Sequence, residues 1–436
     1  MTLPRLPAAL SARIRNGRMA VRSDTEVFQL AHSRHRYERT LGTKPGKRLR
    51  ILMMSGRTPK RGVDGSWGLF ELIRLLGKSH DVTLFSLVDR NESPKYLEAL
   101  RPLVKRLQTH TQERDIGDLD LHHHVPHRIR QSYTAPNLKS HVTTLLRTES
   151  FDVAQVDYFE MAAMVRNHIE GILAVHVVHE PLMRFLGMQQ IHGIIPHCER
   201  WLKHAQAVNF ETRIYPRFTR VSCLSDEDER HLKQWLPNLR TAINPIGVNV
   251  DSIQPCQPSS GYTMLSIGYF GHPPNVDATF WFVQRILPLV QSEIPEAQLR
   301  LIGGGATEEI MALAANPGVT ILGKVAELLD EMESCALTLA PSREGGGLRT
   351  KVLESLAFGR TMVATPVAAS GILVKDGQHL RIANGEKEFA AAIVELLRDT
   401  KLRHSMELEA REMIMRHYTS STMADRAEAI FREAIG

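Results

Sequence analysis

One stretch of the chain combines three glycines, a lysine and a glutamate at a spacing that suits a bound diphosphate. It runs Pro341-Ser-Arg-Glu-Gly-Gly-Gly-Leu-Arg-Thr-Lys-Val-Leu-Glu-Ser-Leu-Ala-Phe-Gly359, and we expect a helix to begin near Leu348. Glycines let a backbone approach a ligand, and the first N–H groups of a helix attract anions. Lys351 adds a charge in the first turn, and Glu354, about 4.5 Å further along, can accept hydrogen bonds from a ribose. The pattern predicts a nucleoside diphosphate ligand.

The same segment has the two faces of an amphipathic helix. With about 100° per residue, the apolar side chains share one half of the helix and the polar ones share the other. Gly359 stands where a helix-ending glycine belongs. The pattern leaves a plainer alternative open, because Gly-rich turns are common and Lys351 with Glu354 could form an ordinary surface pair. The expected buried residues are Leu348, Val352, Leu353, Leu356 and Ala357, and the expected polar ones are Lys351, Glu354 and Ser355.

The elements that must position this segment alternate in a regular way. From residue 50 onward, short apolar runs alternate with amphipathic stretches, which is the pattern of parallel βαβ units. In the first block we expect a helix at Trp67–Leu76. The expected strands of this block are Ile51–Met54, Val82–Val88, Asp152–Val156, Ala174–Val178 and Val221–Leu224.

The alternation restarts after a proline-containing stretch, Asn244–Tyr262, that shows no periodicity and is typical of a linker. In the second block we expect a helix at Val276–Val290 with Asn275 as its N-cap, and helices to the end of the chain. Two blocks of this kind predict two Rossmann-like domains, with ligands bound beyond the carboxyl ends of the strands. The expected strands are Tyr262–Ile267, Leu299–Ile302, Val319–Leu322, Leu337–Ala340 and Met362–Ala364, and the final helices are Phe389–Leu397, Leu402–Met415 and Met423–Ile435.

These segments resemble, in order and spacing, the GT-B glycosyltransferases of the retaining family 4 type, the glycosyl transferases group 1. The Gly-rich segment resembles the nucleotide-sugar site in a Gly-Gly-Gly…Lys variant of the family's E-x(7)-E element. The resemblance covers about residues 50–435 and is most specific in the second half. Further segments carry it: Ser266-Ile-Gly-Tyr-Phe-Gly-His-Pro-Pro-Asn275, Leu299-Arg-Leu-Ile-Gly-Gly-Gly305, Gly323-Lys-Val325, Val363-Ala-Thr-Pro-Val-Ala-Ala-Ser-Gly371, and Ser225 with Asp228 followed by Asn244-Pro-Ile-Gly-Val248.

The resemblance implies an α/β chain of the GT-B class. Two Rossmann-like, doubly wound domains would face a central cleft, and the C-terminal helices would cross back to the first domain. The implied divisions are a basic N-terminal arm at 1–48, an acceptor domain at 49–255 with 418–436 packing on it, and a donor domain at 256–417.

The resemblance also implies where a nucleoside diphosphate sugar binds. Glu354 matches the second glutamate of the family's element, which binds ribose. The backbone of Gly345–Leu348 and the Lys351 side chain would bind diphosphate, and Gly323–Val325 would lie near the base. The implied donor-binding residues are Gly65, Gly271, His272, Asn275, Gly303, Lys324, Val325, Gly345, Gly346, Gly347, Leu348, Lys351 and Glu354.

The sequence departs from the family pattern at two places. The first glutamate of the element falls at Gly346, and Glu344 is the nearest carboxylate. The Arg and Lys that the family places after the first strand of the donor domain are absent, and His272 and Asn275 stand there instead. We interpret the segment as a variant site in which Lys351 supplies the positive charge, and we count Glu344 and Lys351 among the candidate catalytic residues.

The first domain contributes two further candidates. The loop Ser55–Gly68 follows the first strand and contains Gly65, and relatives use this loop near the donor phosphate and the acceptor. His179 follows the strand Ala174–Val178 and resembles the histidine that many relatives place near the transferred sugar. A structural role is the alternative for both, since the loop can be a plain turn and His176 already lies within the same strand.

We expect no metal and no cofactor besides the sugar nucleotide, which is a substrate. Asp118-Leu-Asp120 followed by His122-His123-His124 contains metal-ligating residue types. Three consecutive histidines of a strand cannot all face one ion, however, so a chance surface cluster is the better interpretation.

The formal net charge of +6 over 436 residues is concentrated at one end. Residues 1–50 contain 12 Lys/Arg and three acidic residues, so this segment carries +9 and the rest −3. That excludes a basic nucleic-acid-binding body. The arm could contact anionic lipid, or it could be a solvated or chain-packing arm. We expect no signal peptide and no spanning helix. Four scattered cysteines favour a reducing compartment, so we expect a cytoplasmic protein. If the arm contacts lipid, the protein would lie at the inner face of the cytoplasmic membrane.

The resemblance therefore implies a retaining glycosyltransferase that moves a hexose-type sugar to a hydroxyl of a glycan or a lipid-linked glycan. Two alternatives stay open. One is a nucleotide-sugar epimerase of the same fold, and the other is a catalytically degenerate transferase that serves as a partner in polysaccharide assembly.

Overall fold

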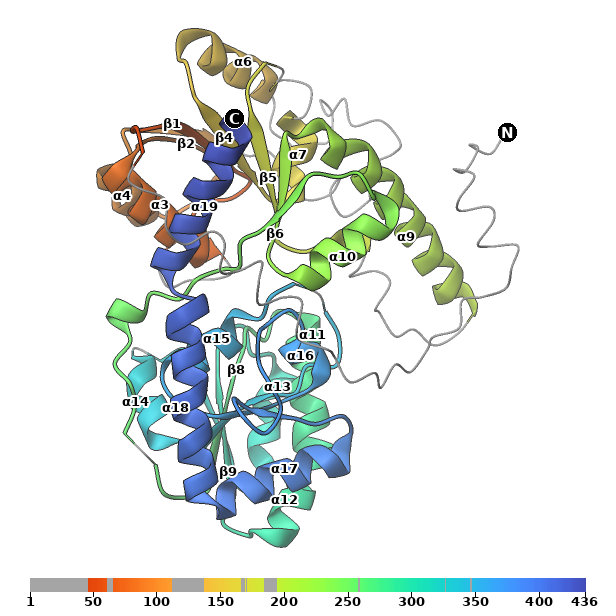
Figure 1. Ribbon diagram of the computed structural model, residues 1–436. Helices are drawn as coiled ribbons and strands as arrows, with labels where there is room; N and C mark the ends of the chain where they lie inside the picture. The colour runs from red at the N-terminus through yellow and green to blue at the C-terminus, as the bar shows by residue number, and fades with distance from the viewer. Residues whose placement is uncertain are drawn as a thin grey trace. The chain divides into compact units, whose positions relative to one another are not determined.

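The described part of the chain contains two parallel β-sheets, each flanked by helices (Figure 1). The computed structural model describes residues 46–60, 66–111, 137–165, 169, 171–183, 194–257, 259–325, 327–345 and 347–436. The first sheet has the order β3-β2-β1-β4-β5-β6-β7 and the second β10-β9-β8-β11-β12-β13. All of these strand pairings are parallel. In each sheet the order of the strands changes direction at the first strand, β1 or β8, as it does in Rossmann folds. The predicted α/β class with two Rossmann-like sheets is confirmed.

The ten predicted strands begin and end close to their predicted positions, whereas β3, β7 and β13 are not predicted from the sequence. Short apolar runs followed by glycine, proline or a polar residue account for this agreement. The first sheet consists of β1 (Arg50–Ser55), β2 (Asp81–Val88), β3 (Arg106–Thr111), β4 (Val153–Asp157), β5 (Ala174–Val178), β6 (Arg220–Cys223) and β7 (Thr241–Ile243). The second consists of β8 (Thr263–Ile267), β9 (Gln298–Ile302), β10 (Val319–Gly323), β11 (Leu337–Ala340), β12 (Met362–Ala364) and β13 (Arg381–Ile382).

Most of the helices connect successive strands, and α17, α18 and α19 follow the last strand. Around the first sheet they are α3 (Trp67–Ser79), α4 (Pro94–Leu100), α6 (Leu138–Thr148), α7 (Phe159–Val165), α9 (Ile194–Ile214) and α10 (Asp226–Trp235). Around the second they are α11 (Pro273–Trp281), α12 (Leu287–Glu293), α13 (Glu308–Ala312), α14 (Leu328–Ser334), α15 (Thr350–Ala357), α16 (Pro366–Ala369), α17 (Glu386–Arg398) and α18 (Thr400–His417). The chain ends with α19 (Ser420–Ile435).

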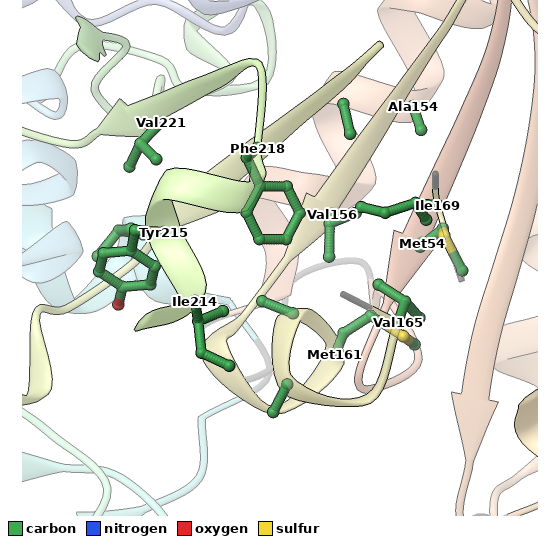
Figure 2. Packing of buried hydrophobic residues seen from close by; sticks show 14 of the residues in the cluster. Met54, Ala154, Val156, Met161, Val165, Ile169, Ile214, Tyr215, Phe218 and Val221 are labelled. Atoms are coloured by element: carbon green, nitrogen blue, oxygen red, sulfur yellow. The ribbon is translucent and has the colours of Figure 1, made fainter. Parts of the chain in front are cut away.

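The first sheet is buried on both faces, and β1 shows how. Ile51 and Met53 belong to one apolar cluster, and Leu52 and Met54 belong to another. Successive side chains of a strand point to opposite faces, so a continuous apolar run places residues in two cores. Figure 2 shows part of the second of these clusters, with side chains from β1, β4 and α7 gathered together.

Helix α19 completes the core of the first sheet although it follows the second sheet in sequence. Phe431 is 1% exposed and Ile430 is 4% exposed. Both pack in the cluster that contains Ile51 and Leu69, and α19 lies beside α3 (Figure 1). The returning helix is therefore a structural part of the first domain.

The linker and the turn before α19 are hydrogen-bonded to each other. The N–H of Val248 donates to the carbonyl of Tyr418 (2.6 Å), and the N–H of Ser420 donates to the carbonyl of Val248 (2.8 Å). A Cβ at Gly247 would lie 2.2 Å from the carbonyl oxygen of Thr419, so only glycine allows this approach. The two connections between the domains thus run together.

The predicted helix at Val276–Val290 is wrong in detail. Helix α11 begins at Pro273, the N-cap position is held by His272, and Asn275 lies in the first turn and not at the cap. Two prolines at the start explain the early beginning, because proline suits the first helical positions. A π-helical turn, Phe282–Ile286, then separates α11 from α12, next to Pro288, which has no N–H to donate to the preceding turn.

Candidate functional site

The turns after β8, β9 and β10 are held together by backbone hydrogen bonds at the carboxyl edge of the second sheet. The N–H of Phe270 donates to the carbonyl of Gly304 (2.9 Å), and that of Gly303 to the carbonyl of Gly323 (2.8 Å). Gly303 has φ +151°, and a Cβ there would lie 1.6 Å from the carbonyl oxygen of Gly268. Glycine is required at this position for the turns to approach each other.

Several predicted donor residues lie on these turns. The ring of Tyr269, 62% exposed, lies so close to Gly271 that an added Cβ would be 2.5 Å from it. His272 is exposed at the start of α11, and Lys324 extends over the turn after β9. Val325 packs against a small apolar cluster. The turns thus form a glycine-containing edge from which a few polar side chains emerge.

The Gly-rich loop leads into α15 two residues later than predicted. The helix begins at Thr350 rather than Leu348, because Gly347 has φ +70° and Arg349 is extended. Arg349 donates hydrogen bonds to the carbonyls of Gly347 (2.6 Å) and Glu344 (3.4 Å) and so ties the two ends of the loop together. Gly345 has φ +109°.

The faces of α15 largely match the expectation. Leu348, Val352 and Leu353 are buried in an apolar cluster, so Leu348 can offer a ligand only its backbone. Ser355 is the exception, because it was expected on the polar face and is 1% exposed. Glu344 is half-buried on the loop, and Gly346 lies outside the described residues.

Lys351 and Glu354 are half-buried on α15 and do not form an ion pair with each other within the described chain. The Nζ of Lys351 lies 3.3 Å from the Oδ1 of Asn275, whose amide nitrogen donates to the carbonyl of Tyr269 (3.0 Å). Asn275 therefore connects the turn after β8 to Lys351. The plain surface-pair alternative does not describe this arrangement.

Burial shifts the ionisation of both groups. It lowers the pKa of Lys351 to about 8, and the positive charge of Arg349 contributes. It raises the pKa of Glu354 to about 7. Both shifts have the same physical cause, namely a charge withdrawn from water without an opposite charge beside it. Shifts of this kind are common at functional sites.

A second loop contact fixes the Gly-rich segment. The guanidinium of Arg343 pairs with Asp277 of α11, with Nε and Oδ2 3.0 Å apart. It also lies 5.2 Å from the ring centroid of Trp281. The loop after β11 and the helix after β8 are thus joined.

His179, the candidate from the first domain, lies at the carboxyl end of β5. Its Nε2 is 3.1 Å from the Oδ1 of Asp157, and its ring stacks on Tyr158 with centroids 4.2 Å apart. A Cβ at Gly347 would lie 2.9 Å from the backbone oxygen of His179. The structure therefore brings the backbone of His179 next to the Gly-rich loop.

Two residues at the site escaped the sequence interpretation. Arg349 is not among the predicted site residues, although an arginine beside a Gly-rich turn is a candidate for binding the carbonyls of that turn. Asp157 ends β4 just as His179 follows β5, and two polar residues at the ends of neighbouring strands could have been paired. The pairing needs the strand order, which the sequence did not provide.

Other predicted candidates fall outside what can be described. Gly65, Asp118, Asp120 and the histidines 122–124 lie outside the described residues, and Gly68 belongs to α3 rather than to the preceding loop. In the described part of the chain, no group of three or more His, Cys, Asp or Glu side chains could hold a metal ion. No helix there is both long and apolar enough to span a membrane.

Comparison with known families gives a match within the second domain. Residues 261–399 match the family model described as "Glycosyl transferases group 1". This range contains β8 to β13, the Gly-rich loop and α15.

Comparison with individual proteins gives distant matches. One is an "Uncharacterized 44.6 kDa protein in cps region" of Klebsiella pneumoniae, 23% identical over 48% of this chain and 54% of that protein. Another is the phosphatidyl-myo-inositol mannosyltransferase of Mycobacterium leprae, 28% identical over 43% of this chain and 52% of that protein. The chain thus spans about half the length of the curated relatives it matches.

A solved structure supports the fold over nearly the whole chain. Anabaena Alr3699/HepE, crystallised with UDP and glucose, is 15% identical, with a TM-score of 0.62. The match covers 88% of this chain and 100% of that one. At this identity the likeness establishes the fold alone, which is the GT-B arrangement of two Rossmann-like domains.

Proposed function

We propose that the protein transfers a hexose-type sugar from a nucleoside diphosphate sugar to a hydroxyl of a glycan or glycolipid. The premise is that residues 261–399 form a group 1 glycosyltransferase domain within a GT-B fold. The observation that carries the proposal is the pair Lys351 and Glu354. Both are half-buried on α15, neither pairs with the other in the described chain, and both have a pKa shifted by burial.

In the proposed complex, Lys351 and the backbone N–H groups around Gly347 bind the donor diphosphate. Their positive charge would stabilise the leaving diphosphate as the glycosidic bond breaks, which is where enzymes of this kind gain most of their rate. Asn275 would orient Lys351 through the 3.3 Å contact. Glu354 would accept hydrogen bonds from the ribose, and Glu344 would lie toward the sugar.

We propose retention of the anomeric configuration because the Gly-rich segment resembles that of retaining relatives. Lys351 supplies the charge that a divalent cation would otherwise bring to the diphosphate, so the proposed transfer needs no metal. NMR of the newly formed glycosidic bond tests the first point. Loss of turnover in chelator, restored by Mg²⁺ or Mn²⁺, would contradict the second.

The donor is testable without knowing the acceptor. Calorimetric titration of the folded protein with UDP-, GDP- and ADP-sugars should show binding of one nucleotide class, and absence of binding to all of them would overturn the proposal. Incubation with the bound donor and no acceptor separates an epimerase, which would interconvert the sugar. Donor binding without turnover across a panel of glycan and glycolipid acceptors would instead assign a partner role.

The acceptor side of the proposal includes contact with a membrane through the basic segment 1–48. This segment contains 11 Lys/Arg and three acidic residues, and its net positive charge suits anionic lipid. Sedimentation with vesicles containing anionic lipid should show binding that weakens in high salt and is lost when residues 1–45 are deleted. Unchanged vesicle binding by the deletion variant would remove this part of the proposal.

A further inference from the structure

The imidazole of His179 is held by a buried carboxylate. Nε2 lies 3.1 Å from the Oδ1 of Asp157, which is 1% exposed, whereas the His179 side chain is 20% exposed. An ionised carboxylate can only accept hydrogen bonds, so Nε2 must carry the proton of this contact. In the neutral ring, Nδ1 then keeps its lone pair and is the nitrogen left for a substrate.

The second oxygen of Asp157 is also satisfied. Oδ2 accepts a hydrogen bond from the Nε2 of Gln155 (2.8 Å), and Gln155 is 2% exposed. The two residues are two positions apart on β4 and therefore share a face of the sheet. Gln155 fixes the carboxylate, and the carboxylate fixes the imidazole.

The returning helix α19 covers this network. Gln155, Asp157 and His179 line a cavity whose other walls include Met423 and Phe431 of α19. The cavity measures about 30 Å³, enough for a water molecule but too small for a sugar nucleotide. The cavity is thus not a substrate site itself, and Gln155 and Asp157 support the imidazole of His179 from its buried side.

A stacking contact with Tyr158 restrains the plane of the His179 imidazole. The rings of Tyr158 and His179 are nearly parallel, with an interplanar angle of 11°. Tyr158 has φ +69°, an uncommon conformation for a residue with a large side chain. Backbone strain of this kind persists where the surroundings hold it, and it concentrates at functional sites.

We infer that Asp157 is a positioning residue for His179, which it holds in the Nε2–H tautomer so that Nδ1 is presented to the substrate beside the Gly-rich loop. The inference rests on the proposed function, since the backbone of His179 approaches the donor-domain residue Gly347. The arrangement matches the general use of a carboxylate to fix the tautomer of a working histidine. Asp157 itself would not contact substrate.

The direct test is the tautomer of His179 in the wild-type protein. Long-range ¹H–¹⁵N correlation spectra, with the His179 signals assigned by their loss in His179→Gln, should show the proton on Nε2. In Asp157→Asn the side-chain amide can donate to Nε2, so the tautomer should change to Nδ1–H. A wild-type Nδ1–H tautomer, or no change in Asp157→Asn, overturns the inference without any activity measurement.

The functional test compares Asp157→Asn with Asp152→Asn as a matched control. Asp152 precedes the same strand and pairs with Arg50 on the surface. Asp157→Asn should keep donor affinity within about 2-fold, while donor turnover falls by at least about 30-fold, and Asp152→Asn should leave both unchanged. Wild-type turnover in Asp157→Asn contradicts the inference, whereas failure of the wild-type protein to bind any sugar nucleotide contradicts the proposed function instead.

Discussion

Single residues at the site bear an electrostatic cost that a ligand would relieve. Lys351 and Glu354 each lose hydration without gaining an opposite charge, and Asn275 gives Lys351 only one neutral contact. A diphosphate would favour the charged form of Lys351, and ribose hydroxyls would favour that of Glu354. The shifted pKa values therefore make testable statements about binding.

Donor affinity should depend on pH with two limbs. Lys351 must be protonated, so affinity should fall as pH rises through about 8, and Glu354 must be ionised, so it should fall as pH drops through about 7. Titration with a sugar nucleotide between pH 6 and 9 measures this. Lys351→Ala should remove the alkaline limb and Glu354→Gln the acidic one, and a profile with both limbs in both variants would contradict the assignment.

Glu354→Gln should stabilise the protein while weakening the donor site. A carboxyl whose folded-state pKa is raised from 4.5 to about 7 loses stability as pH rises between these values, and glutamine does not ionise. The gain in the free energy of unfolding should therefore grow from pH 5 to pH 8, reaching about 1–3 kcal/mol. Denaturant unfolding of both proteins at the two pH values checks this, and an equal gain at both would count against a buried, unpaired carboxylate.

At the scale of elements, the sequence predicted most where local chemistry decides. The sequence predicts the bounds of β1, β5 and β11 closely from their apolar runs, and the end of α15 from the glycine that follows it. The edge strand β3, Arg106–Thr111, is mostly polar, so its sequence does not predict a strand. The start of α15 shifted because Arg349 stays extended to bind loop carbonyls, and the pair Asp157 and His179 depends on strand order. Tertiary contacts determine these features, and periodicity does not report them.

Substitution of Gly303 tests whether the turns after β8, β9 and β10 must lie as close together as they do. A Cβ there would collide with the backbone of Gly268, so Gly303→Ala should cost more than about 3 kcal/mol of folding stability or abolish donor binding. Gly377→Ala is the matched control, because Gly377 also has a positive φ but no atom within 4 Å of its would-be Cβ. We expect the control to cost about 1–2 kcal/mol and to bind donor normally. Equal stability and affinity in the two variants would contradict the account of the turns.

For the whole molecule, the central feature is that the last helix completes the first domain. Helix α19 packs in the core of the first sheet and covers the Gln155–Asp157–His179 network, and the turn before it is hydrogen-bonded to the linker. Loss of α19 contacts should therefore affect the first domain rather than the adjacent second sheet.

Phe431→Ala checks this arrangement. The side chain is 1% exposed in the first core, so its removal should lower the free energy of unfolding by about 3–5 kcal/mol. Ile435→Ala, at a side chain 41% exposed near the end of the same helix, should change it by less than about 1 kcal/mol. Denaturant unfolding measures both, and similar small effects would show that α19 does not support the first domain.

The most direct test of the central claim is a calorimetric titration of the sugar nucleotide against four variants. Lys351→Ala and Glu354→Ala should each weaken donor binding by about 10- to 100-fold, as loss of a hydrogen bond involving a charged group predicts. Lys401→Ala and Glu412→Ala, exposed on α18, should bind like the wild type. Wild-type affinity in both α15 variants would contradict the claim that α15 and its Gly-rich loop form the donor site.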